Sequence, residues 1–155
     1  MLIRNAVDSD LPNILSIEQS VHSHPWKLSH FESSLHNNNI FCVIEAPSEL
    51  EGNTIVGYGI MSFGGGEAEL LNIAVAQSHQ GKSIATTLLN HLIDQVRDVA
   101  EGIFLEVRES NLPAQQLYDK FGFNQVGVRP NYYPSSTKSA AGREDAFIFA
   151  LTIFS

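Results

Sequence analysis

The sequence has 155 residues, 43% hydrophobic and 17% charged, with 17 acidic and 9 basic side chains and a formal net charge of −8. This length and composition predict one folded domain over residues 1–155 with a substantial core, and they exclude a disordered or fibrous chain. The acidic balance argues against direct binding to nucleic acid or to an anionic membrane, because both require a basic surface.

The cysteine content and the absence of long apolar runs indicate where the protein acts. Cys42 is the single cysteine, which excludes an internal disulfide and fits a reducing compartment. No apolar run reaches the length of a bilayer, and the first residues lack the order of a signal peptide. We therefore expect a cytoplasmic protein.

The first half of the chain alternates between strand and helix patterns. A strand is expected at residues 2–5, and the acidic run at 8–10 offers N-caps for a helix that continues to Val21. Ser29 and Glu32 have the spacing of a capping box for a short second helix. Strands with turn residues between them follow at residues 40–45, 55–63 and 69–75.

The second half holds the clearest helix, an apolar stripe that runs from Ile84 to Val96. A strand at residues 103–107 precedes a helix that Asn111 is expected to cap and Gly122 to close. The remaining elements are strands at residues 126–129 and 147–153, with a loop over residues 134–142 between them.

The order of elements, β-α-α-β-β-β-α-β-α-β-β, defines the expected architecture. A strand–helix–strand unit at residues 69–107 requires a parallel crossover, whereas the other connections suit antiparallel pairs. We therefore expect an α+β fold in which a mixed, mostly antiparallel sheet has a central parallel crossover and helices on both faces.

The segment after residue 75 has the features of a phosphate-binding loop. A strand passes through a short polar loop into an amphipathic helix, where unpaired backbone N–H groups meet the positive end of the helix dipole. Gly81, Lys82 and Ser83 match the end of a Walker A loop, but Ala76 stands where that motif needs glycine. A P-loop nucleotidase is thus disfavoured, and the pyrophosphate of coenzyme A is the other candidate.

Several motifs, in order along essentially the whole chain, resemble one enzyme family. Gln80-x-x-Ser83-x-Ala85 resembles the acetyl-CoA loop of the GNAT (Gcn5-related) N-acetyltransferases, with Ser83 in place of the usual glycine. Residues 111–123 are similar to the family pattern N-x-x-A-x-x-L-Y-x-x-x-G-F. The runs HSHPW at residues 22–26, NYYP at 131–134 and GREDA at 142–146 resemble the RimI branch, the ribosomal-protein-alanine N-acetyltransferases.

The resemblance implies a single-domain GNAT fold that uses acetyl-CoA as co-substrate and holds no metal. It implies direct acetyl transfer to the N-terminal α-amine of a protein, the alanine of a small-subunit ribosomal protein, with Glu106 as general base and Tyr118 as general acid. Trp26, Tyr132 and Tyr133 are candidate walls of the acceptor groove. The implied cofactor contacts are Ile73, Ala74, Val75, Gln80, Gly81, Lys82, Ser83, Ile84, Ala85, Thr86 and Asn111.

The uneven distribution of charge suggests the kind of acceptor. Residues 1–78 hold nine acidic and two basic side chains, a net charge of −7, whereas residues 79–155 carry −1. In a GNAT fold much of the first half builds the acceptor side, which suits the basic N-terminal segment of a ribosomal protein. We expect acetyl-CoA and this segment as partners, and neither nucleic acid nor a membrane.

Structural explanations remain open for most of these residues. Glu106 and Arg108 could form a charged pair on the sheet surface, Tyr118 could be a core residue, and Lys82 could be a solvated loop charge. The aromatic residues could be ordinary packing, the histidines lack the spacing of a zinc site, and Cys42 lies in a strand interior. The alternative functions are a GNAT enzyme for a lysine, a small amine or other N-termini, and a non-catalytic acyl-CoA-binding module.

Overall fold

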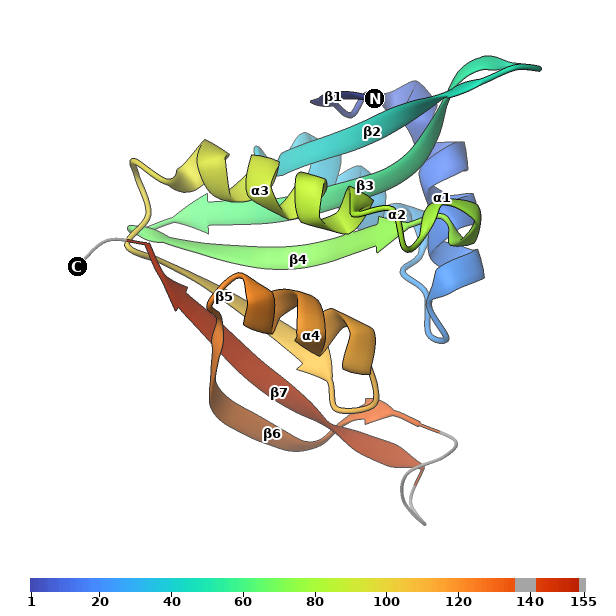
Figure 1. Ribbon diagram of the computed structural model, residues 1–155. Helices are drawn as coiled ribbons and strands as arrows, with labels where there is room; N and C mark the ends of the chain where they lie inside the picture. Colours follow the sequence, from blue (N-terminus) through green and yellow to red (C-terminus); the bar gives the residue numbers. More distant parts are fainter. Residues whose placement is uncertain (136–141, 154–155) are drawn as a thin grey trace.

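A seven-stranded mixed sheet forms the centre of the computed structural model, which describes residues 1–135 and 142–153 (Figure 1). Its spatial order is β1-β2-β3-β4-β5-β7-β6, and β4 and β5 are parallel whereas the other neighbours are antiparallel. The expected element order and the central parallel crossover are confirmed. The strands are β1 (Leu2–Asn5), β2 (Ile40–Ser48), β3 (Gly52–Gly64), β4 (Glu67–Val75), β5 (Gly102–Arg108), β6 (Asn124–Pro134) and β7 (Arg143–Thr152).

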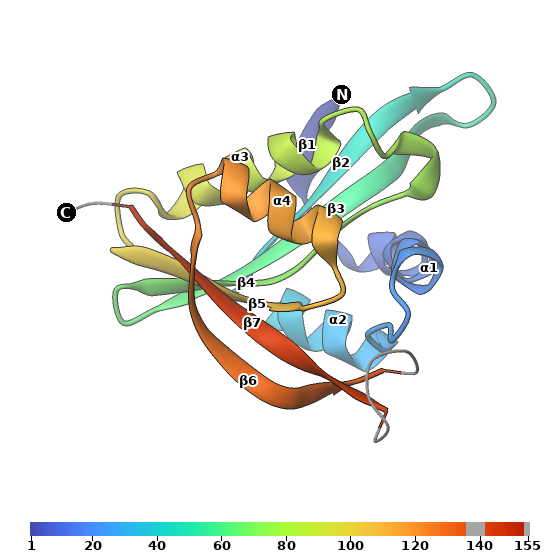
Figure 2. The same ribbon diagram turned by 60° about the horizontal axis from the view of Figure 1, so that its bottom comes forward.

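Helices cover both faces of the sheet, as expected. Figures 1 and 2 show α3 and α4 over one face and α1 and α2 over the other. Within the described part of the chain, no helix is long and apolar enough to cross a membrane. The helices are α1 (Leu11–Val21), α2 (Leu28–His36), α3 (Ile84–Val96) and α4 (Leu112–Lys120), with short 3-10 turns η1 (Asp8–Asp10) and η2 (Gln77–His79).

Each face of the sheet has its own hydrophobic core. Leu92 of α3 and Leu105 of β5 belong to the core under α3 and α4, whereas Phe31 of α2 and Tyr58 of β3 belong to the core under α1 and α2. A Cβ atom on Gly59 would lie 2.6 Å from Leu92 Cδ1, so the glycine permits the close approach of α3 to the sheet. The two cores fix the sheet between the helix layers.

Two predicted element boundaries are wrong for local reasons. α2 begins at Leu28, and the imidazole of His30 accepts a hydrogen bond from the Lys27 backbone N–H at 3.0 Å. The predicted capping box of Ser29 and Glu32 is therefore not the start of this helix. Near the N-terminus, the 8–10 segment forms η1 ahead of α1 rather than supplying a side-chain cap to it.

β6 is much longer than the strand predicted at residues 126–129. Register shifts between Gln125 and Gly127 and between Arg129 and Tyr133 interrupt its pairing with β7. Such irregularities disturb the alternation of apolar and polar residues by which a strand is recognised in sequence. Of the loop predicted over residues 134–142, residues 136–141 lie outside the described residues.

Candidate active site

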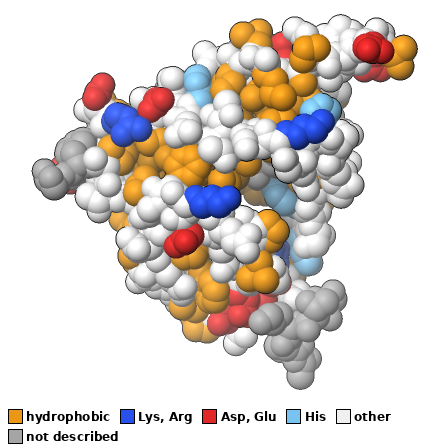
Figure 3. Space-filling model, viewed as in Figure 1, with side chains coloured by type: hydrophobic (Ala, Val, Ile, Leu, Met, Phe, Trp, Pro, Cys, Tyr) orange, Lys and Arg blue, Asp and Glu red, His pale blue; other side chains and the backbone are white. Residues whose placement is uncertain are grey.

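A cleft opens where the two parallel strands part. β4 and β5 pair from Glu67 and Gly102 to Leu70 and Leu105, after which β4 continues along β3 and β5 along β7. The cleft has a volume of about 920 Å³ and is lined by residues of α1, β4, the loop before α3, β5 and α4. Figure 3 shows it as a hollow on this face of the molecule, with basic side chains at its rim and histidine side chains within it.

The cleft brings together almost all of the residues singled out in the sequence. Lys82 and Tyr132 are the two predicted residues that do not line it: Lys82 is exposed, and the Tyr132 ring lies 5.3 Å from the Arg129 guanidinium. The predicted residues that line the cleft are Trp26, Ile73, Ala74, Val75, Gln80, Gly81, Ser83, Ile84, Ala85, Thr86, Glu106, Asn111, Tyr118 and Tyr133.

The loop before α3 has the backbone shape of an anion-binding site. Gly81 and Ser83 both adopt left-handed conformations, with φ of 78° and 61°, and Ser83 immediately precedes the helix. Ser83 thus takes the conformation usually reserved for glycine, at a typical cost of about 1 kcal/mol. The Gln80 side chain donates a hydrogen bond to the Val75 carbonyl at 3.0 Å and ties the loop to the end of β4. The first N–H groups of α3 have no partner within the helix and are available to an anion.

Tyr118 presents a protonated phenol to the cleft from α4. Its side chain is buried, and its ring packs against Phe123 at 5.7 Å and Phe149 at 6.3 Å between ring centroids. Burial, with a smaller contribution from Tyr133, raises the pKa of Tyr118 well above its usual value. The hydroxyl therefore keeps its proton at neutral pH and can donate it to a partner that gains negative charge.

The Asn111 side chain caps α4 by accepting a hydrogen bond from the Ala114 N–H at 3.3 Å.

Glu106 reaches the cleft from the last part of β5. Its neighbours Leu105 and Val107 point into the core under α3 and α4, so Glu106 extends from the opposite side of the strand. Arg129 Nε lies 2.9 Å from Glu106 Oε1, whereas Arg108 pairs with Glu144 at 3.5 Å. The pair considered from the sequence, Glu106 with Arg108, is therefore not the one that forms. Glu106 pairs with Arg129, and Arg108 pairs with Glu144.

A second cavity, of about 370 Å³, lies on the opposite side of β4 and β5 from α3 and α4. Glu67, Glu69, Phe104 and Arg129 contribute to its lining, and Glu106 lines both this cavity and the cleft. Burial, and then the charge of Glu106, raises the pKa of Glu69. The parting of the strands thus leaves Glu106 accessible from both faces of the sheet.

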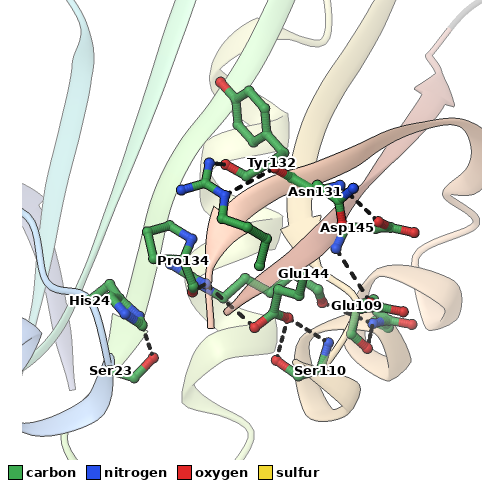
Figure 4. Close-up of polar contacts among 12 residues, drawn as sticks. Ser23, His24, Glu109, Ser110, Asn131, Tyr132, Pro134, Glu144 and Asp145 are labelled. Atoms are coloured by element: carbon green, nitrogen blue, oxygen red, sulfur yellow. Dashed lines mark hydrogen bonds and ion pairs between the residues drawn. The ribbon is translucent and has the colours of Figure 1, made fainter. Parts of the chain in front are cut away.

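A polar network fixes the end of β6 beside the cleft (Figure 4). Glu144 is buried and accepts hydrogen bonds from the Ser110 N–H at 3.1 Å and hydroxyl at 2.6 Å. Burial acts to raise the pKa of Glu144, but hydrogen bonds from Ser110 and Ser135 and the charge of Arg108 together outweigh it and lower the pKa. Arg108 donates to the Pro134 carbonyl at 2.7 Å, and its guanidinium lies 4.3 Å from the centre of the Tyr133 ring. These contacts hold Tyr133 at the cleft wall.

One carboxylate in the cleft was not recognised in the sequence. Glu18 of α1 is 1% exposed and accepts hydrogen bonds from the Tyr58 hydroxyl, His22 Nδ1 at 2.8 Å, the Trp26 N–H at 2.9 Å and Asn72 Nδ2 at 3.1 Å. Burial acts to raise the pKa of Glu18, but the bonds from His22, Tyr58 and the Trp26 backbone outweigh it and lower the pKa to about 2. Glu18 is therefore ionised in the folded protein.

Two further features of the lining bear on sequence interpretation. The spacing of Glu18 and His22, four residues apart at the C-terminal end of α1, is a signal for their pairing. Lys120, in the last turn of α4, also lines the cleft and supplies a positive charge there, although no motif drew attention to it.

Metal and cysteine chemistry have no support in the described ranges. Among residues 1–135 and 142–153, no group of three or more His, Cys, Asp or Glu side chains could hold a metal ion. Cys42 is fully buried in β2, and burial raises the pKa of its thiol to about 11. A thiol in such surroundings behaves as a small apolar residue.

Comparison with known proteins identifies clear relatives. The family described as "Acetyltransferase (GNAT) family" matches residues 10–123. The chain is 37% identical over 147 residues to the [ribosomal protein bS18]-alanine N-acetyltransferase of Escherichia coli K12, covering 94% of this chain and 93% of that protein. It is 38% identical over 142 residues to the enzyme of the same name from Haemophilus influenzae, covering 91% of each.

Solved structures agree with these sequence relatives. The crystal structure of the ribosomal-protein-S18-alanine N-acetyltransferase from Escherichia coli superposes with a TM-score of 0.84 at 35% identity, over 99% of this chain and 94% of that one. Arabidopsis thaliana NAA60 in complex with acetyl-CoA gives a TM-score of 0.85 at 18% identity, over 98% of each chain, and so shares the fold.

Proposed function

The chain belongs to the GNAT family of acetyltransferases, and we propose that it transfers the acetyl group of acetyl-CoA to the N-terminal alanine of ribosomal protein bS18. The observation that carries this proposal is the 37% identity, over 94% of the chain, with the Escherichia coli enzyme of that activity. The cleft at the parting of β4 and β5 supports it, because cofactor, base and acid candidates converge there.

The cofactor would be held along the parted strands. The loop and first turn of α3, residues 80–86, offer backbone N–H groups to the pyrophosphate, and Lys120 adds a positive charge. The backbone of residues 73–75 has no partner on β5 and would align the pantetheine arm and the thioester. Asn111 lines the same cleft and would contact the cofactor from the start of α4.

The reaction requires a neutral amine, a base and an acid. A protein α-amine has an ordinary pKa of about 7.7–8.0, so it is partly protonated at neutral pH. Its nitrogen attacks the thioester carbonyl carbon, Glu106 takes a proton from that nitrogen directly or through water, and the carbon–sulfur bond breaks. Tyr118 donates its proton to the departing thiolate. The raised pKa of Tyr118 keeps that proton in place until the thiolate forms.

Peptides test the acceptor assignment. The protein is incubated with acetyl-CoA and a peptide that begins Ala-Arg, or with the same peptide carrying a blocked N-terminus, and thiol release is measured. Release only with the free N-terminus is expected. Release that persists with the block and needs an internal lysine would assign a lysine acceptor instead, and tight binding of acetyl-CoA without release from any amine would indicate a non-catalytic binding module.

Two substitutions test the assigned roles. Glu106→Gln and Tyr118→Phe should each lower kcat by about 10²-fold, the usual effect of losing a general base or acid. Calorimetry should give an unchanged Kd for acetyl-CoA in both variants, and Glu101→Gln, at an exposed acid just before β5, serves as the matched control. If both variants keep the wild-type rate, the assigned base and acid are wrong.

The negative charge of residues 1–78 supplies a test of whether the acceptor segment is basic. A −7 charge over residues 1–78 would attract a basic peptide over distances beyond contact, and salt screens such attraction. We expect kcat/KM for a basic acceptor peptide to fall as ionic strength rises, and kcat/KM for a neutral peptide to change little. A flat profile for the basic peptide would remove this role for the charge.

A further inference from the structure

A carboxylate–imidazole pair forms the part of the cleft wall that adjoins β4. His22 Nδ1 lies 2.8 Å from Glu18 Oε1, and both residues line the cleft. Ionised Glu18 can only accept hydrogen bonds, so Nδ1 of His22 must carry the hydrogen. When the imidazole is neutral, Nε2 therefore holds a free lone pair that can accept a proton.

The orientation of this imidazole is fixed by a buried anchor. Besides His22, the Glu18 carboxylate accepts from Tyr58 of β3, from Asn72 of β4 at 3.1 Å and from the Trp26 backbone at 2.9 Å. Partners from two strands and a loop hold the carboxylate in place, and the carboxylate in turn orients the ring through Nδ1. Carboxylates orient imidazoles in this way in many sites of proton transfer.

The exposed part of His22 suits proton transfer. Its side chain is 32% exposed, whereas the Glu18 side chain is 1% exposed. Within residues 1–135 and 142–153, Nε2 of His22 has no hydrogen-bond partner. The ring is therefore anchored on one edge and open on the other, with access both to the cleft and to solvent.

Acetylation of a protonated amine removes two protons from the same nitrogen. The first must leave before attack, because an ammonium group has no lone pair, and the second leaves once the new carbon–nitrogen bond has formed. Glu106 can take one of them, and one of its oxygens is already engaged by Arg129. The overall reaction returns one proton to the thiolate and releases the other, so a second acceptor with access to solvent completes the scheme.

We propose that His22, held by Glu18, accepts the first proton from the acceptor's α-ammonium group. The nitrogen–hydrogen bond of the ammonium breaks and a bond to Nε2 forms, so the positive charge moves to the imidazolium, which the Glu18 carboxylate stabilises. The proton then passes from Nε2 to solvent, and Glu106 takes the second proton after attack. This inference rests on the proposed function and adds a catalytic residue, His22, and a positioning residue, Glu18, to it.

Two acceptor peptides separate this role from a merely structural one. One begins with alanine, and the other is identical except for 3-fluoroalanine, whose electron-withdrawing fluorine lowers the amine pKa and leaves the amine largely neutral at the assay pH. His22→Ala should lower kcat/KM for the alanine peptide at pH 7 by up to about tenfold, because only about a tenth of an amine with a pKa near 8 is already neutral there. For the fluoroalanine peptide the loss should be much smaller, because little of that amine needs to be deprotonated.

A matched control uses another histidine that pairs with a carboxylate. His36 lies on α2 outside the cleft, and its Nε2 is 3.0 Å from Asp8 Oδ1. His36→Ala should leave kcat/KM for both peptides at the wild-type value. Thermal unfolding and the Kd for acetyl-CoA establish that each variant is folded and binds its cofactor.

The outcomes distinguish a failure of the role of His22 from a failure of the proposed function. A selective loss with the alanine peptide supports the role of His22. An equal loss with both peptides, or no loss with either, overturns it while leaving the proposed function intact. Failure of the wild-type protein to acetylate either peptide would overturn the proposed function itself.

Discussion

Acid should remove a large share of the stability that Glu18 contributes. The pKa of this carboxyl falls from its ordinary 4.5 to about 2 in the folded protein, and a tenfold change in an acid constant is worth about 1.4 kcal/mol. Ionised Glu18 therefore stabilises the fold by about 3 kcal/mol, and its burial leaves little screening by solvent. Because the pKa is lowered by folding, this contribution is complete above pH 4.5 and is lost as the pH falls toward 2, with about 2 kcal/mol gone by pH 3.

Urea unfolding of the wild-type protein and of Glu18→Gln measures this directly. The amide has the shape of the carboxyl but cannot ionise, so the difference in unfolding free energy between the two proteins should shrink by about 2 kcal/mol from pH 7 to pH 3. Glu32→Gln, at an exposed acid on α2, is the control, and its difference from wild type should stay constant. A wild-type to Glu18→Gln difference that is the same at both pH values would refute the assigned ionisation of Glu18.

Three further substitutions or reactions test the packing and the loop. Gly59→Ala should lower the unfolding free energy by about 1–3 kcal/mol in urea titrations, because the new methyl would meet the fully buried Leu92. Ser83→Gly should raise it by up to about 1 kcal/mol without weakening acetyl-CoA binding in calorimetry, since glycine adopts φ near 61° without strain. The Cys42 thiol, with its raised pKa of about 11, should resist a thiol reagent in the folded protein and react fully in urea, and rapid labelling without denaturant would contradict its burial.

The sequence was sufficient for elements whose signals are local. The apolar stripe of α3 and the Asn111 cap of α4 predicted both helices closely, because helix periodicity and capping depend on residues a few positions apart. The start of α2 and the extent of β6 were not predictable in this way. The start of α2 depends on His30 in an unusual capping role. The extent of β6 depends on bulges whose position is set by pairing with β7.

The candidate site likewise contains residues with local sequence signals and residues that depend on distant partners. The loop from Gln80 and the strand that carries Glu106 are short, contiguous patterns, and the structure places both in one cleft. Glu18 is not predictable from the sequence, because its partners Tyr58 and Asn72 lie 40 and 54 positions away and no local pattern distinguishes it from a surface acid on an amphipathic helix. The left-handed conformation of Ser83 was likewise unexpected from its residue type.

Glu106 lies where β4 and β5 separate, and it borders the cleft on one side and the smaller cavity on the other. Under the proposed function, the cofactor would lie along the parted strands and the acceptor terminus would enter beside Trp26 and Tyr133, which line the cleft and not the smaller cavity. Only the terminal residues of the acceptor then need to fit inside the cleft. A globular protein that offers a few free terminal residues could react as readily as a short peptide, while the body of that protein stays in solution.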